Sequence, residues 1–267
     1  MYDRTIESKT ITLGNSSAVY ESDMLMFDHG TGSYWLQITG EAIVGPLTGK
    51  RLKLLPSQTT TWGLWKKQFP DTQVLSRKTG FMFDYKIDWS VGLGQRLNRG
   101  EEFFYPVSMA GRDSRLQPGE VVLSVQISGS RRAYPIEQIG DAVINDRIDE
   151  TSVVIFSAAD GPTGAAYVPI VKDQLLTFLL TDGVFRDDQT GSTWNLAGLA
   201  TDGDLAGTQL EALPVCSTFW FALVASYPDI EVYRDRSTWA VTGWILSLCG
   251  SMLLVRRRLS LAAYLRN

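Results

Sequence analysis

Apolar residues recur at short, strand-like intervals over most of this chain. The clearest run is 121–127, which is rich in valine and is followed by a Ser-Gly-Ser turn, and 131–135 returns as its partner strand. A further β-branched strand is predicted over 151–157. Short strands between turn residues, with few helical patterns, predict a mainly β protein with short helices, that is, a β-rich α+β fold.

One order of motifs occurs twice. The motif Thr-Gly-Ser-x-Trp stands at 31–35 and again at 190–194, and in both places two aspartates precede it. A glycine-containing run, a Leu-Pro pair and an aromatic segment follow both copies. The first tryptophans are 159 positions apart (35 and 194) and the next are 158 apart (62 and 220), so one residue has been lost between them. Self-similarity at a fixed spacing indicates an internal duplication and two related domains.

Two short helices are predicted at equivalent places in the repeats. Trp62, Trp65 and Phe69 lie at i, i+3 and i+7, and Pro70 ends this helical pattern. The segment 219–227 is its more apolar counterpart. Further strands are predicted at 11–14, 24–28, 34–38 and 103–107, with one or two more in 165–180 and a short helical turn in 136–143.

The duplication sets the expected domains. They are a first repeat at 1–76, a long connecting loop at 77–119 and a second repeat at 120–234. The second repeat has a preamble over 121–180, whereas the first has only 23 residues before Met24. We therefore expect the first copy to be incomplete at its N-terminal side, with the native start upstream of Met1.

The C-terminal part differs from the rest. Residues 239–255 are seventeen residues without a charge, and three arginines follow at 256–258. Seventeen residues are at the lower limit for a membrane-spanning helix, and an arginine cluster after an apolar run is typical of its cytoplasmic end. The predicted elements are an apolar transmembrane helix from Trp239 to Val255 and a basic tail at 256–267. Because Thr, Ser and Gly interrupt the run, a buried terminal helix is the alternative.

The predicted localisation is the membrane, in one of two orientations. Positive residues on the cytoplasmic side would make the preceding domain extracytoplasmic. The N-terminus, however, has no signal peptide pattern. Either the native start lies upstream of Met1, or Met1 is the true start, the segment inserts as a tail anchor and the domain is cytoplasmic.

Composition limits the partners and cofactors. The net charge of −4 is spread without long like-charge blocks, which argues against nucleic acid as a partner, because binding it needs a basic face. The only cysteines, Cys216 and Cys249, and the only histidine, His29, cannot supply a disulfide framework or a four-ligand zinc site. We predict no cofactor and no metal.

Several segments resemble the prokaryotic domain-of-unknown-function family 3179. They are Asp23-Met24-Leu25-Met26-Phe27-Asp28, Thr31-Gly32-Ser33-Tyr34-Trp35, Thr39-Gly40-Glu41-Ala42, Leu54-Leu55-Pro56, Arg132-Ala133-Tyr134-Pro135 and Asn145-Asp146. The resemblance implies a Trp-His-Glu motif at 139–141 and a Cys-Pro-Leu-Cys run beginning at 157, yet this chain has Ile-Gly-Asp and Ser-Ala-Ala-Asp there. The second copy therefore lacks the family's histidine and cysteines, which would form the obvious metal or redox site.

Five residues of the first repeat are candidate ligand-binding residues. They are Asp23, Asp28, Trp35, Gln37 and Glu41. A carboxylate pair could hold a cation or act in acid/base chemistry, and Gln37 and Glu41 are replaced by Leu196 and Ala200 in an ungapped match to the second repeat.

Each candidate also has a purely structural interpretation. Aspartates beside Thr-Gly usually cap turns, and Gln37 and Glu41 could simply face solvent. Trp35, Trp62 and Trp65 could line a sugar-stacking groove, but repeated aromatic residues at strand and helix spacing are more often core residues, and His29 is interpreted as an exposed turn residue. No catalytic residue is predicted.

The leading hypothesis is a non-catalytic, membrane-associated binding or scaffold protein, whose ligand is an unidentified protein or small molecule. The alternative is a metal-binding or hydrolytic enzyme, with its site in the first repeat around Asp23, Asp28, Gln37 and Glu41 and completed by sequence upstream of Met1. A third hypothesis is a subunit of a larger assembly.

Overall fold

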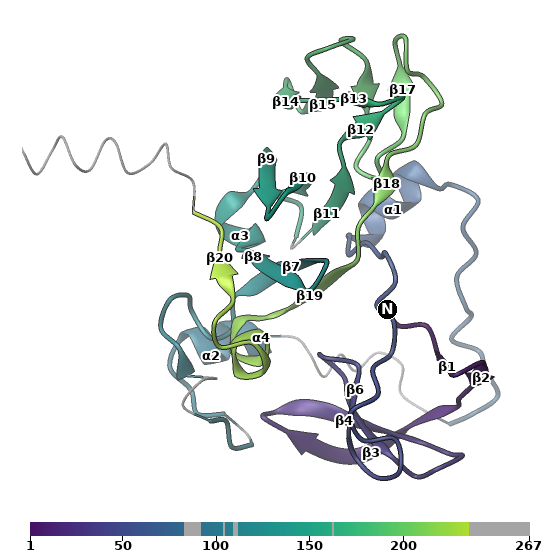
Figure 1. Ribbon diagram of the computed structural model, residues 1–267, viewed down its shortest axis with the longest axis vertical. Helices are drawn as coiled ribbons and strands as arrows, with labels where there is room; N and C mark the ends of the chain where they lie inside the picture. The colour runs from purple at the N-terminus through teal and green to yellow at the C-terminus, as the bar shows by residue number, and fades with distance from the viewer. Residues whose placement is uncertain (83–91, 104, 109–111, 162, 235–267) are drawn as a thin grey trace, which may run out of the picture. The chain divides into compact units, whose positions relative to one another are not determined.

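The computed structural model describes most of the chain (Figure 1). The described residues are 1–82, 92–103, 105–108, 112–161 and 163–234. Both the predicted transmembrane segment 239–255 and the basic tail 256–267 lie outside them. Among the described residues, no helix is long and apolar enough to cross a membrane.

The first repeat contains a four-stranded antiparallel sheet. Its strands follow one another in the order β3 (Leu13–Tyr20), β4 (Asp23–Asp28), β5 (Tyr34–Leu36) and β6 (Glu41–Val44). A small hairpin of β1 (Thr5–Ile6) and β2 (Lys9–Thr10) precedes it. The sequence predicts a strand at 11–14. β3 begins two residues later, at Leu13, and continues to Tyr20, because the polar residues 15–17 form a bulge within the strand instead of ending it.

The second repeat contains a sheet of the same topology. Its strands are β14 (Phe178–Thr181), β15 (Val184–Asp187), β16 (Thr193–Trp194) and β17 (Ala200–Asp202), again in sequential antiparallel order. In both sheets the register shifts at the tryptophan of the third strand, between Tyr34 and Trp35 and between Thr193 and Trp194. The two indoles are buried in separate core clusters.

Two further sheets are each built from strands that come before and strands that come after β14–β17 in the sequence. One has the order β19 (Val215–Phe219), β7 (Val121–Ile127), β8 (Ser130–Tyr134) and β20 (Glu231–Val232); the other has the order β18 (Glu211–Ala212), β11 (Thr163–Val168), β10 (Thr151–Ala158) and β9 (Ala142–Ile148). The predicted β7–β8 hairpin is confirmed, and Ser128 and Gly129 make its turn with positive φ angles.

Four helices, all short, occur in the described residues. They are α1 (Trp62–Gln68), α2 (Leu93–Asn98), α3 (Ile136–Ile139) and α4 (Trp220–Ser226). The side chain of Thr61 caps α1 by accepting a hydrogen bond from the Leu64 amide, and Gly140, at φ 68°, ends α3. One core cluster surrounds α4, whose residues 220–224 are all buried.

Several sequence predictions are corrected. The described residues of 103–107 form no strand, and α2 lies where a loop was expected. The segment 165–180 adds β12 (Ile170–Val171), β13 (Gln174–Leu175) and β14 to the end of β11, instead of one or two strands. Trp62 is not a core residue, because half of its side-chain surface is exposed and α1 has no buried residue.

Trp62 and Trp220 begin equivalent helices, and their different burial makes a direct prediction. Trp220→Ala removes a fully buried indole and should lower the free energy of unfolding by about 3–5 kcal/mol. Trp62→Ala should lower it by less than about 1 kcal/mol. Urea unfolding of both variants beside the wild type measures the difference, and equal losses would contradict the burial of the two helices.

Candidate functional site

The predicted site residues Asp28 and Trp35 are buried and bonded to each other. Asp28 Oδ2 accepts hydrogen bonds from Trp35 Nε1 at 3.2 Å and from Thr31 Oγ1 at 2.7 Å, while Oδ1 accepts from the Thr31 amide at 2.6 Å. Both carboxylate oxygens are therefore occupied by groups of the same turn and strand.

These bonds determine the protonation of Asp28. Burial by itself raises the pKa of a carboxyl group, but the hydrogen bonds from Thr31 and Trp35 to the carboxylate outweigh it, and the pKa of Asp28 is lowered from its usual 3.8. The group is thus held as an anion, an acceptor for the surrounding donors.

The second repeat has the same cluster around Asp187. Its carboxylate accepts from Trp194 Nε1 at 3.0 Å and from the Thr190 amide at 2.7 Å. In both clusters the hydroxyl of a serine, Ser33 or Ser192, is hydrogen-bonded to the hydroxyl of the threonine. The same serine oxygen accepts a hydrogen bond from a backbone amide of the following loop, at 3.0 Å in the first copy and 3.1 Å in the second. Each cluster holds together the end of the second strand, the turn after it and the third strand of its sheet, so the two aspartates have a structural role.

Asp23 does not share a role with its predicted counterpart Asp182. Asp23 Oδ2 accepts from the Ile38 amide at 3.0 Å, and burial raises the pKa of Asp23. Asp182 lies in an exposed turn at φ 51°. The hairpin of β3 and β4 is longer than that of β14 and β15, so the equivalent sequence positions fall in a strand in one copy and in a turn in the other.

Gln37 and Glu41 lie at the end of β5 and the start of β6. The Gln37 side chain is exposed, and Glu41 pairs with Arg51. The backbone bridge of Glu41 to Arg51 corresponds to that of Leu199 to Gln209, 158 positions later. The structural counterpart of Glu41 is thus Leu199, not the Ala200 of the ungapped match, because the spacing between the two repeats changes from 159 to 158 positions after the tryptophan.

The five candidates do not enclose a common pocket. None of them lines either of the two pockets described below. Within the described part of the chain, no group of three or more His, Cys, Asp or Glu side chains is arranged to hold a metal ion.

A hollow between α1 and the second repeat is a better candidate for binding. We call it the α1 cleft; its volume is about 360 Å³. Trp65 of α1 and Phe69, which follows the helix, form one wall, with their ring centroids 4.4 Å apart, and Tyr167 of β11 lies on the other. The remaining lining residues are mostly small or apolar: Met1, Pro56, Ser57, Gln58, Ala165, Ala166, Ala197 and Ala212.

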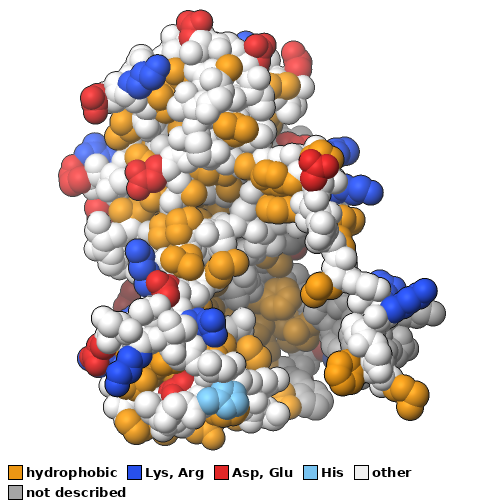
Figure 2. All heavy atoms as spheres, turned by 90° about the vertical axis from the view of Figure 1, so that its right-hand side faces the viewer, with side chains coloured by type: hydrophobic (Ala, Val, Ile, Leu, Met, Phe, Trp, Pro, Cys, Tyr) orange, Lys and Arg blue, Asp and Glu red, His pale blue; other side chains and the backbone are white. Residues whose placement is uncertain are grey.

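Small side chains make this space. Four alanines line the cleft, so β11 and β18 leave room for a group that the described residues do not supply. Tyr167 is fixed because its hydroxyl donates to the Leu196 carbonyl at 2.7 Å and its ring lies against Gly198, where a Cβ would be 2.6 Å from the ring. Figure 2, which faces the side of α1 and β18, shows hydrophobic side chains gathered across the middle of this face.

Sequence reasoning missed this site because it assigned Trp62 and Trp65 to the core. One signal was present. Lys66 and Lys67 stand where α4 has Val224 and Ala225, so the two helices cannot be equally buried.

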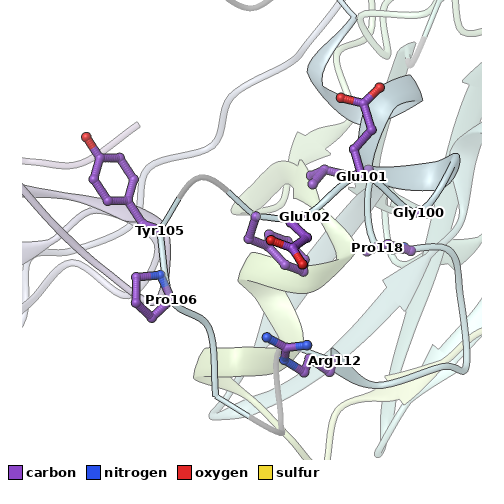
Figure 3. A pocket seen from close by; sticks show the side chains of 9 residues that line it. Gly100, Glu101, Glu102, Tyr105, Pro106, Arg112 and Pro118 are labelled. Carbon is purple, nitrogen blue, oxygen red and sulfur yellow. The ribbon is translucent and has the colours of Figure 1, made fainter.

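A second pocket, of about 570 Å³, lies beside α2 (Figure 3). Glu102, Tyr105 and Arg112 line it, and the side chains of Glu101 and Glu102 diverge. The hydrogen bonds from Arg96 and Arg99 lower the pKa of Glu101, so this carboxylate is already paired. The pocket is wide and charged, in contrast to the apolar α1 cleft.

Comparison with known proteins gives one match. The model of a family described as a protein of unknown function (DUF3179) matches residues 1–230. No curated protein and no solved structure matches the chain.

The lowered pKa of Asp28 predicts a pH dependence of stability. Because the folded protein binds this proton less readily than the unfolded chain, Asp28 stabilises the fold above about pH 4, and this contribution is lost as the pH falls through its lowered pKa. Asp28→Asn should be less stable at pH 7 by about 1–3 kcal/mol and should lose less further stability on acidification than the wild type.

Urea unfolding between pH 7 and about pH 2 measures both effects. Gln37→Ala changes an exposed neutral side chain and serves as the control, with a wild-type pH profile expected. A profile of Asp28→Asn that parallels the wild type would show that Asp28 does not carry this dependence.

Proposed function

The chain belongs to the DUF3179 family of proteins of unknown function, and we propose that it is a non-catalytic binding or scaffold protein that takes an apolar group of its ligand into the α1 cleft. We place its association with the membrane in the segment Trp239–Val255. The ligand is a small molecule or a protein.

The α1 cleft is the observation that carries this proposal. Phe69, which lines the cleft, is 40% exposed, and Trp62 at the start of the adjacent helix is 50% exposed, so aromatic surface is open to water in and beside a preformed hollow. Burying apolar surface contributes about 25 cal/mol per Å², and aromatic side chains are the usual anchors of binding sites. A volume of about 360 Å³ is at the small end of the range for ligand pockets.

The enzyme alternative has less support. It requires Asp28 as an acid, base or ligand, but both oxygens of Asp28 already accept hydrogen bonds from Thr31 and Trp35. Asp23 is likewise committed to the Ile38 amide. A reacting group or metal ion would have to displace these donors.

We also propose that the two sheets arose by internal duplication. The two aspartate clusters support this, as does a tyrosine contact that recurs: Tyr2 donates to the Ile38 carbonyl at 2.8 Å and its ring packs on Gly40, as Tyr167 does with Leu196 and Gly198. The incompleteness of the first copy stays a prediction.

The membrane proposal depends on sequence alone. Seventeen uncharged residues followed by three arginines favour a spanning helix with its basic end in the cytoplasm, which places residues 1–234 outside the cytoplasm. The tail-anchored orientation is the alternative.

Binding of an apolar fluorescent dye such as anilinonaphthalene sulfonate tests the cleft. The folded protein should bind about one dye per chain with raised emission, and Ala212→Leu, which fills the cleft, should weaken binding about tenfold, because each buried apolar side chain contributes 1.5–3 kcal/mol. Val44→Ala, an exposed change in β6, is the control. Unchanged binding by Ala212→Leu would place the dye elsewhere and remove the support for this site.

Fractionation of cells that express the full chain tests the membrane proposal. The chain should sediment with membranes and resist extraction by carbonate, whereas a chain ending at residue 234 should not. Recovery of the full chain in the soluble fraction without detergent would contradict the proposal.

A further inference from the structure

The segment 56–69 has a counterpart at 214–227, and the two are bonded very differently. Pro56, Trp62 and Phe69 match Pro214, Trp220 and Tyr227 at a constant spacing of 158. The helices have the same length, and in each the amide after the last helical residue donates to the carbonyl four positions earlier, at 2.8 Å in α1 and 2.9 Å in α4. The local backbone is therefore the same in both.

In the second copy the β7–β8 hairpin covers this unit. Residues 215–219 form β19 and pair antiparallel with 121–125 of β7. Val122 and Ala133 of the hairpin belong to the core cluster of α4, in which Trp220 is 0% exposed. Arg131 of β8 lies over the ring of Tyr227, with its guanidinium carbon 4.2 Å from the ring centroid.

In the first copy no described strand takes the place of that hairpin. Among the described residues, 57–61 form a single bridge, from Thr59 to Gly164 of β11. Because backbone groups point alternately to the two sides of a strand, the neighbours of Thr59 direct theirs to the opposite edge. That edge and the outer face of α1 are what β7 and β8 cover in the second copy.

Unpaired polar atoms mark the same unit. Four buried side-chain atoms have no hydrogen-bond partner among the described residues, and two of them, Thr60 Oγ1 and Gln68 Nε2, lie in 56–69. A buried polar atom without a partner costs about 1–3 kcal/mol, so the packing of this unit is less well satisfied than that of the buried helix α4.

We propose that 57–69 is the docking site for a β-hairpin of a partner protein. The first strand of the hairpin pairs antiparallel with 57–61, and its apolar face covers Trp62 and the mouth of the α1 cleft. This is strand addition to an open edge, with specificity supplied by side-chain pockets. The inference rests on the proposed function and names the partner for the same cleft.

Charge defines the partner further. Lys66 occupies the position of Val224, which is 1% exposed in the core cluster that includes Val122 and Ala133 of the hairpin. A hairpin that covers α1 in the same way lies near this ammonium group, and an acidic side chain there is favourable whereas a basic one is not. The partner hairpin therefore has an apolar face with one carboxylate opposite Lys66.

The hairpin of this chain provides a probe. A cyclised peptide with the sequence of residues 120–135 keeps the strand pattern of β7 and β8, and Ala133→Glu places a carboxylate on the face that packs against the helix. We expect this peptide to bind the full chain, the unchanged peptide to bind about tenfold more weakly, and an Ala133→Lys peptide to bind more weakly still. Calorimetry measures the affinities, and hydrogen exchange should show amides 57–61 newly protected.

Three variants of the full chain locate the contact. Thr60→Pro removes a backbone N–H group from the open edge, and Trp62→Ala removes the exposed indole against which the hairpin would pack. Each should weaken binding of the Ala133→Glu peptide at least tenfold. Val44→Ala, on the edge strand β6, should bind like the wild type. Equal binding by all three, or equal affinity for the Glu and Lys peptides, would overturn the proposal.

The dye experiment separates this inference from the proposed function. If Ala212→Leu weakens binding of the dye but the peptide does not bind to the wild type, the cleft remains a binding site and the hairpin is rejected as its partner. Failure of both probes would reject both proposals.

Discussion

A carboxylate removed from water must have its oxygens satisfied by donors, and this constraint organises both copies of the four-stranded sheet. Asp28 and Asp187 each accept hydrogen bonds from an indole, a threonine and the turn between two strands, and these N–H and O–H donors satisfy the buried anion. The register shift beside each tryptophan, the turn and the following loop all depend on these bonds.

Much of this framework was readable from the sequence. The Thr-Gly-Ser-x-Trp motif marks the turn between the second and third strands, because its threonine, serine and tryptophan form the hydrogen bonds around the aspartate. The valine-rich run 121–127 followed by a Ser-Gly-Ser turn specifies a hairpin without reference to the rest of the chain. Features set by local geometry are the ones that sequence reasoning predicted correctly. The assignment of His29 to an exposed turn belongs with them.

The α1 cleft could not be predicted in the same way. The spacing of Trp62, Trp65 and Phe69 correctly indicates a helix, but burial depends on which strand lies across it, and that strand is distant in sequence in the second copy and not among the described strands in the first. Likewise, the counterpart of Glu41 depends on where the spacing between the two repeats changes from 159 to 158 positions, and the backbone bridge to Arg51 locates that change. The residues chosen as a site for their chemistry are mostly structural, whereas the open surface lies on a helix assigned to the core.

The bridge between Pro56 and Pro214 has a consequence for how such a chain could have arisen. A residue that pairs antiparallel with its own equivalent, as these prolines do 158 positions apart, lies at a local two-fold axis. Self-complementary contacts of this kind are what hold C2 homodimers together. If the two copies descend from one, a single-copy ancestor could have dimerised through this contact, and joining the copies in one chain would have replaced a concentration-dependent assembly by a permanent one with a high effective concentration. The two halves would then be free to diverge, so that the helix α4 became buried in one and the helix α1 stayed exposed in the other.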